Sequence, residues 1–275
     1  MTYQTIEVTE TEARLTIMLN RPEALNSLTL DLFGEFEQAL AHVATRQDVR
    51  VIVVMGAGRA FSAGVDPSVL WQMASGISKS EFQSELTHFQ KVFNMMEEVE
   101  KPTIAAVNGV ALGGGLILAL CCDFRIASER AIFGLPEVRI GFPVIMGTHR
   151  LTRVVGVARA KELAMTGKRI SAQKAEAIGL VNRVVLADQL DQAVDELAGT
   201  LAGLAPLALG LQKRIIDRGW SMDGDAAQAI ERDLQSRLLN SEDLREGLAA
   251  LTEKRSPKFV GRWGETYVSF RLPKS

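Results

Sequence analysis

The chain has 275 residues, of which 47% are hydrophobic and 23% charged, and its formal net charge is −2. This composition is typical of a globular protein. The near-neutral charge gives no general basic surface, so we expect neither nucleic acid nor an anionic membrane as a partner. No apolar run approaches the roughly 20 residues of a membrane helix, and residues 1–10 contain no apolar signal core, which together predict a cytoplasmic protein.

In chain order, the hydrophobic pattern first predicts two paired strands and then strands that alternate with helices. Residues 5–19 are expected to form the strand pair, with a turn near residues 10–12. Further strands are expected at residues 51–55, 103–107 and 123–127, and helices at residues 30–43, 82–96 and 113–122. The run from Val51 to Met55 is apolar throughout, which is typical of a strand covered on both faces.

Beyond about Thr148 the pattern becomes mainly helical. Helical stretches are expected near residues 149–165, 171–177, 188–203, 206–218 and 222–251. Strands followed by helices predict an α/β core over residues 1–200 and a helical C-terminal region over residues 201–275.

The cysteines and histidines do not indicate a metal site or a disulfide. Cys121 and Cys122 are adjacent, a spacing that fits neither zinc binding nor a disulfide framework, so we expect buried thiols in a reducing compartment. His42, His88 and His149 are far apart in the sequence and form no ligand pair. We therefore expect no bound metal.

Two common enzyme motifs also do not match. A dinucleotide fingerprint that begins at Gly56 would need its third glycine where Phe61 stands. Ser62 lacks the flanking glycines of a nucleophile elbow.

Two glycine-containing stretches that follow predicted strands are hard to explain by packing alone. Residues 58–66 contain small residues that let the backbone approach a ligand closely. Residues 108–115 lead into a predicted helix and end in three consecutive glycines, which lower helix propensity. A loose turn is one interpretation. The other is a helix N-terminus whose free amides point at a developing negative oxygen.

A third stretch, residues 133–143, places Glu137 among apolar side chains. Burial there would disfavour the charged carboxylate and raise its pKa toward that of a general base. The alternative is an exposed acid in a loop.

In this order and spacing, the chain resembles the enoyl-CoA hydratase/isomerase (crotonase) family. The resemblance is carried by residues 19–26, 60–66, 106–115, 122–123, 133–141, 156–167, 175–184 and 246–259. It implies a spiral of ββα turns followed by a helical trimerisation region, assembled as a homotrimer or homohexamer. It also implies an acyl-CoA thioester as substrate, with coenzyme A as part of that substrate and no separate cofactor.

The resemblance implies roles for individual residues as well. The backbone amides of Val65 and Gly114 match the donors of the family's oxyanion hole, and Glu137 matches a catalytic acid. The carbonyl of Ala63 matches an adenine contact, and Lys254 matches a basic residue that reaches the CoA of a neighbouring subunit. Further substrate contacts are expected from Asp66, Trp71, Gly113, Ile117 and Ile145.

Only one of the family's two frequent catalytic acids is present. Hydratases usually carry a second glutamate where this chain has Ile117, whereas Δ3,Δ2-enoyl-CoA isomerases are similar in having an aliphatic residue there. One base is enough to move a proton from C2 to C4, so we interpret the chain as an isomerase that converts a 3-enoyl-CoA to the 2-enoyl form. Ile145 stands where dienoyl-CoA isomerases and chlorobenzoyl-CoA dehalogenases have an aspartate, which argues against both.

Other functions stay open at this point. An enoyl-CoA hydratase or lyase is the main alternative, followed by a CoA-thioester hydrolase and a non-catalytic acyl-CoA-binding protein. The acyl group is not specified, although residues 70–93 are rich in apolar side chains that suit an apolar acyl tail. Ordinary helix packing is the alternative explanation for Phe89 and Phe93.

Overall fold

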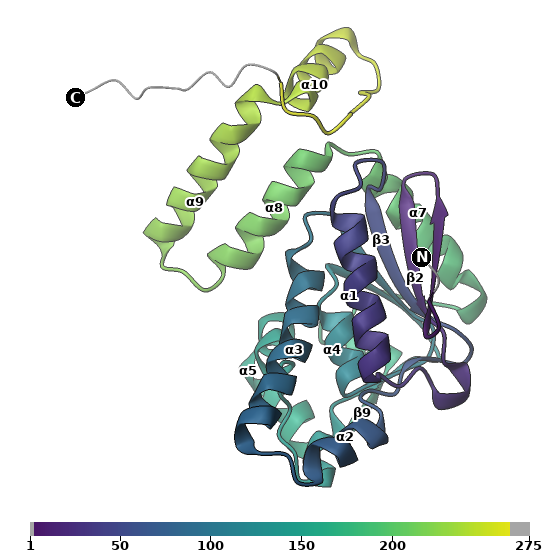
Figure 1. Ribbon diagram of the computed structural model, residues 1–275. Helices are drawn as coiled ribbons and strands as arrows, with labels where there is room; N and C mark the ends of the chain where they lie inside the picture. Colours follow the sequence, from purple (N-terminus) through teal and green to yellow (C-terminus); the bar gives the residue numbers. More distant parts are fainter. Residues whose placement is uncertain (1–2, 265–275) are drawn as a thin grey trace. The chain divides into compact units, whose positions relative to one another are not determined.

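The computed structural model describes residues 3–264, except for the side chains of Met73 and Ala74 (Figure 1). The chain forms two compact units. The first comprises Met1–Val99 and Thr103–Ala198, and the second comprises Glu100–Pro102 and Gly199–Ser275. All the strands of the described residues belong to the first unit, which also carries the candidate site.

The first unit contains two sheets. The larger sheet has the strand order β1 (Ile6–Thr11), β2 (Arg14–Leu19), β3 (Val51–Gly56), β5 (Thr103–Val107), β7 (Phe124–Ser128) and β10 (Arg183–Val185). The smaller sheet has the order β4 (Ala60–Ser62), β6 (Val110–Leu112), β8 (Ile132–Gly134) and β9 (Arg169–Ser171). All neighbouring strands are parallel except the pairs β1 with β2 and β8 with β9.

The chain passes from the larger to the smaller sheet three times in the same way. Strands β3, β5 and β7 lie in the larger sheet, and β4, β6 and β8, which follow them, lie in the smaller one. Helices follow β4 and β6 before the chain returns to the larger sheet. This repetition is the expected spiral of ββα turns, which is confirmed.

Seven α-helices lie wholly or mostly in the first unit of the described chain. They are α1 (Leu30–Ala44), α2 (Pro67–Ala74), α3 (Lys79–Glu98), α4 (Gly114–Leu120), α5 (Thr148–Thr166), α6 (Ala172–Ala177) and α7 (Leu190–Ala202), with short 3-10 turns η1 (Pro22–Ala24), η2 (Pro136–Ile140) and η3 (Ala187–Gln189). The second unit contains α8 (Pro206–Gly219), α9 (Gly224–Arg237), η4 (Leu238–Asn240) and α10 (Glu242–Glu253). Among the described residues no single helix is long and apolar enough to cross a membrane, and only α8 together with residues 187–202 meets that test of length and composition.

Helices α1 and α3 of the spiral begin where side chains cap their free amides. Thr29 accepts a hydrogen bond from the Leu32 amide at the start of α1. Ser78 and Glu81 form a reciprocal capping box at the start of α3. Both helices then bury an apolar stripe, and they pack against each other beside the strands (Figure 1).

The C-terminal half departs from the sequence prediction in two places. It contains the strands β9 and β10, which were not predicted because three residues are too few to show an alternating pattern. The expected helix over residues 222–251 is broken into α9 and α10, since Ser241 is extended and its side chain caps the amide of Leu244.

Candidate active site

The loop after β4 presents a free backbone amide at Val65. Leu28 pairs with this loop: its amide donates to the carbonyl of Gly64 at 2.8 Å, and its carbonyl accepts from the amide of Asp66 at 3.0 Å. These bonds use the peptide groups on either side of Val65. The Val65 N–H therefore points away from Leu28 and meets no acceptor among residues 3–264.

A second free amide lies at the start of α4. Gly113 adopts φ 51° and ψ −125°, a conformation for which glycine carries no steric penalty, and its amide donates to the Gly134 carbonyl at 3.0 Å. Gly114 is the first residue of α4, where an N–H has no partner within the helix. In the described chain no other acceptor takes it.

The two amides lie close together because glycines allow their loops to touch. A Cβ atom on Gly114 would lie 3.4 Å from the Val65 nitrogen, and a Cβ atom on Gly64 would lie 3.2 Å from the Gly114 nitrogen. The latter atom would also be only 2.7 Å from the Leu112 carbonyl oxygen, so Gly64 tolerates no side chain. Two adjacent N–H donors, one of them at a helix N-terminus, can stabilise a negative oxygen between them.

Glu137 places its carboxylate beside this pair of amides. The residue lies in η2, which begins with Pro136 after the end of β8. Its Oε1 would be 3.0 Å from a Cβ atom on Gly113, the residue immediately before the free Gly114 amide. The carboxylate and the amide pair therefore share one site.

The surroundings of Glu137 favour its neutral form. Burial raises the pKa of this carboxyl group above its usual value, and a hydrogen bond with its own backbone offsets only part of that effect. Its Oε2 is buried and has no hydrogen-bond partner among the described residues. A raised pKa and an unoccupied acceptor are the properties that a proton-transfer group needs.

These groups open into a cavity of about 260 Å³. Its wall is mainly apolar and comes from α1, the loop after β4, α2, α3, α4 with the residue before it, and the segment that follows β8: Phe33, Ala63, Gly64, Val65, Leu70, Phe82, Leu86, Phe89, Phe93, Gly113, Gly114, Ile117, Pro136, Glu137, Arg139, Ile140, Phe142, Pro143, Ile145 and Met146. Glu137 is the only acid among these lining residues. Such a wall suits an apolar ligand that presents one polar group to the amides.

Most of the site residues that were predicted from the sequence line this cavity. The lining includes Ala63, Gly113, Ile117 and Ile145 as well as the two amide donors and Glu137. Ile117 is 4% exposed and packs against Gly147. The aliphatic side chain therefore fills the place where a second acid was considered.

Two predicted substrate contacts do not line the cavity. Trp71 is 72% exposed and lies outside it, because the α2 face that carries this side chain is turned to solvent. Asp66 caps the start of α2, where its carboxylate accepts hydrogen bonds from Ser27, Ser68 and Arg21. For these two residues the structure does not support the predicted contact with substrate.

Lys254 belongs to the second unit, whereas the residues that line the cavity belong to the first. It is exposed and ends α10 in a left-handed conformation, with φ 55°.

The sequence analysis did not identify several residues of the cavity wall. Phe33 follows the same helical periodicity as the core residues of α1, and nothing in its spacing separates the two roles. Phe89 and Phe93 are 4% and 2% exposed, so they belong to the core and line the cavity at the same time. Helix packing therefore applies to both phenylalanines, and their place in the cavity wall leaves contact with an acyl tail as a prediction.

The cysteines and the possible metal ligands have no part in this site. Cys121 and Cys122 are buried, as expected, and form no disulfide within residues 3–264; burial raises the pKa of the Cys121 thiol well above its usual value. Within residues 3–264 no three His, Cys, Asp or Glu side chains gather closely enough to hold a metal ion.

An α/β spiral with two convergent backbone amides and a buried carboxylate defines a class of enzymes that stabilise enolates of thioesters. Comparison with known proteins agrees with this class. The sequence profile of the family described as enoyl-CoA hydratase/isomerase matches residues 9–262. The chain therefore belongs to the enoyl-CoA hydratase/isomerase family, and it is an enzyme of the crotonase superfamily.

Individual relatives carry names from both branches of the family. The chain is 40% identical to the crotonyl-CoA hydratase of Syntrophomonas wolfei over 264 residues, which cover 95% of this chain and all of that protein. It is 34% identical to the peroxisomal Δ(3,5)-Δ(2,4)-dienoyl-CoA isomerase of Arabidopsis thaliana, over 94% of this chain and 98% of that one. The crystal structure of enoyl-CoA hydratase from Bacillus anthracis superposes with a TM-score of 0.88 at 38% identity, covering 94% of this chain and 100% of the other.

Proposed function

We propose that the cavity holds the acyl part of a CoA thioester, with the thioester oxygen between the amides of Val65 and Gly114. Negative charge develops on that oxygen when a proton leaves C2, and two preorganised donors stabilise it as it forms. Glu137 lies beside the same donors and is the acid available in the cavity wall. On this proposal Glu137 accepts the proton from C2, and the two adjacent amides stabilise the negative charge on the oxygen.

We further propose that the reaction is a double-bond shift. The carboxylate of Glu137 takes a proton from C2 of a 3-enoyl-CoA, and the electron pair of that C–H bond forms a conjugated dienolate. Glu137 then returns the proton to C4, the double bond forms between C2 and C3, and the carboxylate is regenerated. The single observation that carries this proposal is that Glu137 is the one acid among the described lining residues of the cavity, where Ile117 stands in place of a second one.

Hydration of a 2-enoyl-CoA is the second candidate, and the names of the relatives favour it. The proteins that are 40% and 39% identical to this chain are named crotonyl-CoA hydratase and short-chain-enoyl-CoA hydratase. Addition of water requires a proton at C2 and an activated water at C3, work that two carboxylates commonly share. In this chain Glu137 would have to serve both steps.

The direct test compares the two reactions with the purified protein. A 3-enoyl-CoA and crotonyl-CoA are supplied in parallel, and products are separated by chromatography. We expect the double-bond shift to be at least about tenfold faster than hydration, which corresponds to roughly 1.4 kcal/mol in barrier height. Hydration that equals or exceeds the shift establishes the second candidate and removes the single-base proposal.

A variant of Ile117 sharpens this test. In Ile117→Glu the new carboxylate would replace a buried apolar side chain that packs against Gly147, so we expect lower stability but a gain in hydration relative to the double-bond shift. Ile117→Gln is the matched control, because it has a similar shape and polarity but cannot exchange a proton. An equal change in both variants would show that a second acid does not separate the two reactions here.

The same substrates test two further functions, thioester hydrolysis and acyl-CoA binding without catalysis. Release of free CoA thiol without a shifted or hydrated product would indicate a thioester hydrolase. Binding of acyl-CoA without any turnover would indicate a non-catalytic binding protein. The raised pKa of Glu137 supports an enzymatic role over the latter.

Assembly and CoA contact are also proposals. The described part of the second unit exposes large apolar side chains, among them Ile216, Trp220, Leu248 and Leu251, and such surfaces favour association. We propose a trimer or hexamer in which Lys254 contacts the CoA phosphates bound to a neighbouring subunit. We also propose that the protein is located in the cytoplasm. Light scattering measures the assembly, and loss of CoA affinity in Lys254→Ala, largest at low salt, tests the contact.

A further inference from the structure

Arg150 is a buried cation that the proposed chemistry does not use. It lies near the start of α5 and is 6% exposed. Its Nη1 donates to the Met146 carbonyl at 2.6 Å, and its Nη2 donates to Asn94 Oδ1 at 2.8 Å and to Glu97 Oε2 at 2.6 Å. The guanidinium group also lies over the ring of Phe93, 5.9 Å from its centroid. A buried charge has a high desolvation cost unless it is paired in this way. Loss of one partner leaves an uncompensated buried charge, which is strongly destabilising.

The contacts of Arg150 connect two walls of the cavity. Phe93 lines the cavity from α3, the helix that also carries Asn94 and Glu97. Met146 lines it from another segment, between η2 and α5. One buried side chain therefore bonds to both walls without entering the cavity itself.

The Met146 wall depends on such support. Met146 has φ 66°, a left-handed conformation that is unfavourable for a residue with a side chain and persists only when its surroundings hold it. The next residue, Gly147, packs directly against Ile117 of α4, where a Cβ atom would lie only 2.7 Å from Cγ1. A hydrogen bond from Arg150 to the Met146 carbonyl fixes the peptide between these two residues.

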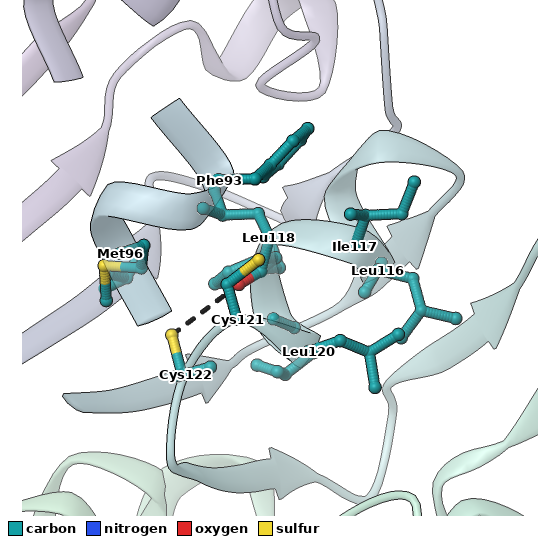
Figure 2. Packing of buried hydrophobic residues seen from close by; sticks show 14 of the residues in the cluster. Phe93, Met96, Leu116, Ile117, Leu118, Leu120, Cys121 and Cys122 are labelled. Carbon is teal, nitrogen blue, oxygen red and sulfur yellow. Dashed lines mark hydrogen bonds between the residues drawn. The ribbon is translucent and has the colours of Figure 1, made fainter. Parts of the chain in front are cut away.

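The α3 wall also shares a buried cluster with α4. Figure 2 shows Phe93 and Met96 of α3 in one buried cluster with Leu118, Cys121 and Cys122 at the end of α4. Side chains in a dense cluster of this kind have little freedom to move apart. The position of the Phe93 ring therefore depends on this cluster beneath it and on Arg150 beside it.

We propose that Arg150 is a positioning residue that fixes the separation of the α3 wall and the Met146 wall, and thereby sets the acyl-chain length that the cavity prefers. The inference rests on the proposed acyl-CoA substrate. A long acyl tail extends between both walls, whereas a short one reaches little beyond the amide pair and Glu137. Loss of Arg150 should therefore weaken the binding of long tails much more than that of short ones.

The experiment measures binding of two saturated thioesters, butyryl-CoA and octanoyl-CoA, by calorimetry. Arg150→Lys keeps a positive charge near Glu97, but a single ammonium group cannot reproduce the planar fork that serves three acceptors. We expect its Kd for octanoyl-CoA to rise roughly tenfold, equivalent to about 1.4 kcal/mol, and its Kd for butyryl-CoA to change less than about threefold. Arg153→Lys is the matched control, since Arg153 lies on the same helix and approaches the same Glu97 only at 4.0 Å, and it should leave both values unchanged.

A second variant guards against loss of the fold. Asn94→Ala removes one partner of Arg150 from a partly exposed position and should produce the same selective effect in weaker form. Equal weakening of both thioesters in the Arg150 and Asn94 variants, or no weakening, overturns the inference, because a purely structural role does not distinguish tail lengths. If the unmodified protein binds neither thioester, the proposed function fails, and the inference fails with it. If it binds both and the ratio never changes, only the inference fails.

Discussion

Asp66 and Glu137 both lie beside a residue of the pair of free amides, yet their carboxylates have contrasting surroundings. Asp66 follows Val65 in sequence and accepts hydrogen bonds from Ser27, Ser68 and Arg21, which hold its pKa well below the usual value. Glu137 has a buried Oε2 with no partner among the described residues, and burial raises its pKa.

The difference in hydrogen bonding distinguishes a carboxylate with a structural role from one that can accept a proton. A carboxylate whose oxygens are already satisfied stays ionised and holds its neighbours in place, as Asp66 does for the Val65 loop and the start of α2. A carboxylate with a vacant oxygen and a raised pKa can accept a proton at moderate cost. On this view the acid with the weaker hydrogen bonding is the proposed base.

The strongest test of this comparison is Glu137→Gln. The amide has nearly the same shape but cannot accept a proton, so we expect turnover to fall by about 10²- to 10⁴-fold. Saturated acyl-CoA binding should change little, because the thioester oxygen is held by backbone amides. The measurement is kcat with the best substrate found, together with calorimetric binding.

The same variant should be more stable than the unmodified protein, although its turnover is lower. The pKa of Glu137 is higher in the folded state than in the unfolded state, so the folded protein binds the proton more tightly. The protein therefore loses stability as the pH rises from the unfolded-state pKa through the folded-state pKa. Removing the buried charge should therefore raise the thermal midpoint at neutral pH. A variant that is less stable and still active would contradict the assignment of Glu137 as a strained, functional acid.

The next largest effect should come from removing one amide donor. Gly114 is the first residue of α4, a position that accepts proline, and Gly114→Pro deletes its N–H. We expect a loss of about 10²- to 10³-fold in kcat. Gly114→Ala is the control: its Cβ meets the same neighbours, Val65 and Leu28, at 3.1 and 3.2 Å, but it keeps the donor. If alanine and proline reduce the rate equally, crowding rather than the missing amide is responsible.

Much of this site was predictable because its parts lie in short, ordered stretches of sequence. The three consecutive glycines at residues 113–115 were compatible with a loose turn or with a helix N-terminus that has free amides, and the structure begins α4 there. Asp66 was misinterpreted for a physical reason. Its partners Ser27 and Arg21 are about forty residues away along the chain, and only the folded loop brings them together.

The cavity wall shows a similar limit. Phe33, Phe89 and Phe93 have the spacing of core residues, and their second role depends on how far α1 and α3 stand from the opposite segment. Arg150 gave no signal in a helix that already contained several basic residues, because its burial follows from tertiary packing. Spacing predicts which face of a helix is apolar, but not whether that face closes on a cavity.

A smaller effect is expected in the pH dependence of the rate. The proposed base must be ionised to take a proton, so kcat/KM should fall about tenfold per pH unit below the pKa of Glu137. Because burial raises that pKa, the acid limb should lie above the usual glutamate value of 4.5. A limb at or below that value, in a protein that stays folded, would count against the buried carboxylate as the base.

The smallest effect on the rate should come from Asp66→Asn, which alters the acid that the structure satisfies. Asparagine can still accept from Ser68 but presents N–H groups toward Arg21, so we expect a loss of stability of about 2 kcal/mol and less than about a tenfold loss of kcat. The folded-state pKa of Asp66 lies below its unfolded value, so its contribution is complete above the unfolded pKa and disappears as pH falls through the folded one. The stability difference between variant and unmodified protein should therefore shrink on acidification, as urea unfolding at fixed protein concentration can measure. Loss of turnover as complete as in Glu137→Gln, with the fold intact, would show that both acids take part in the chemistry.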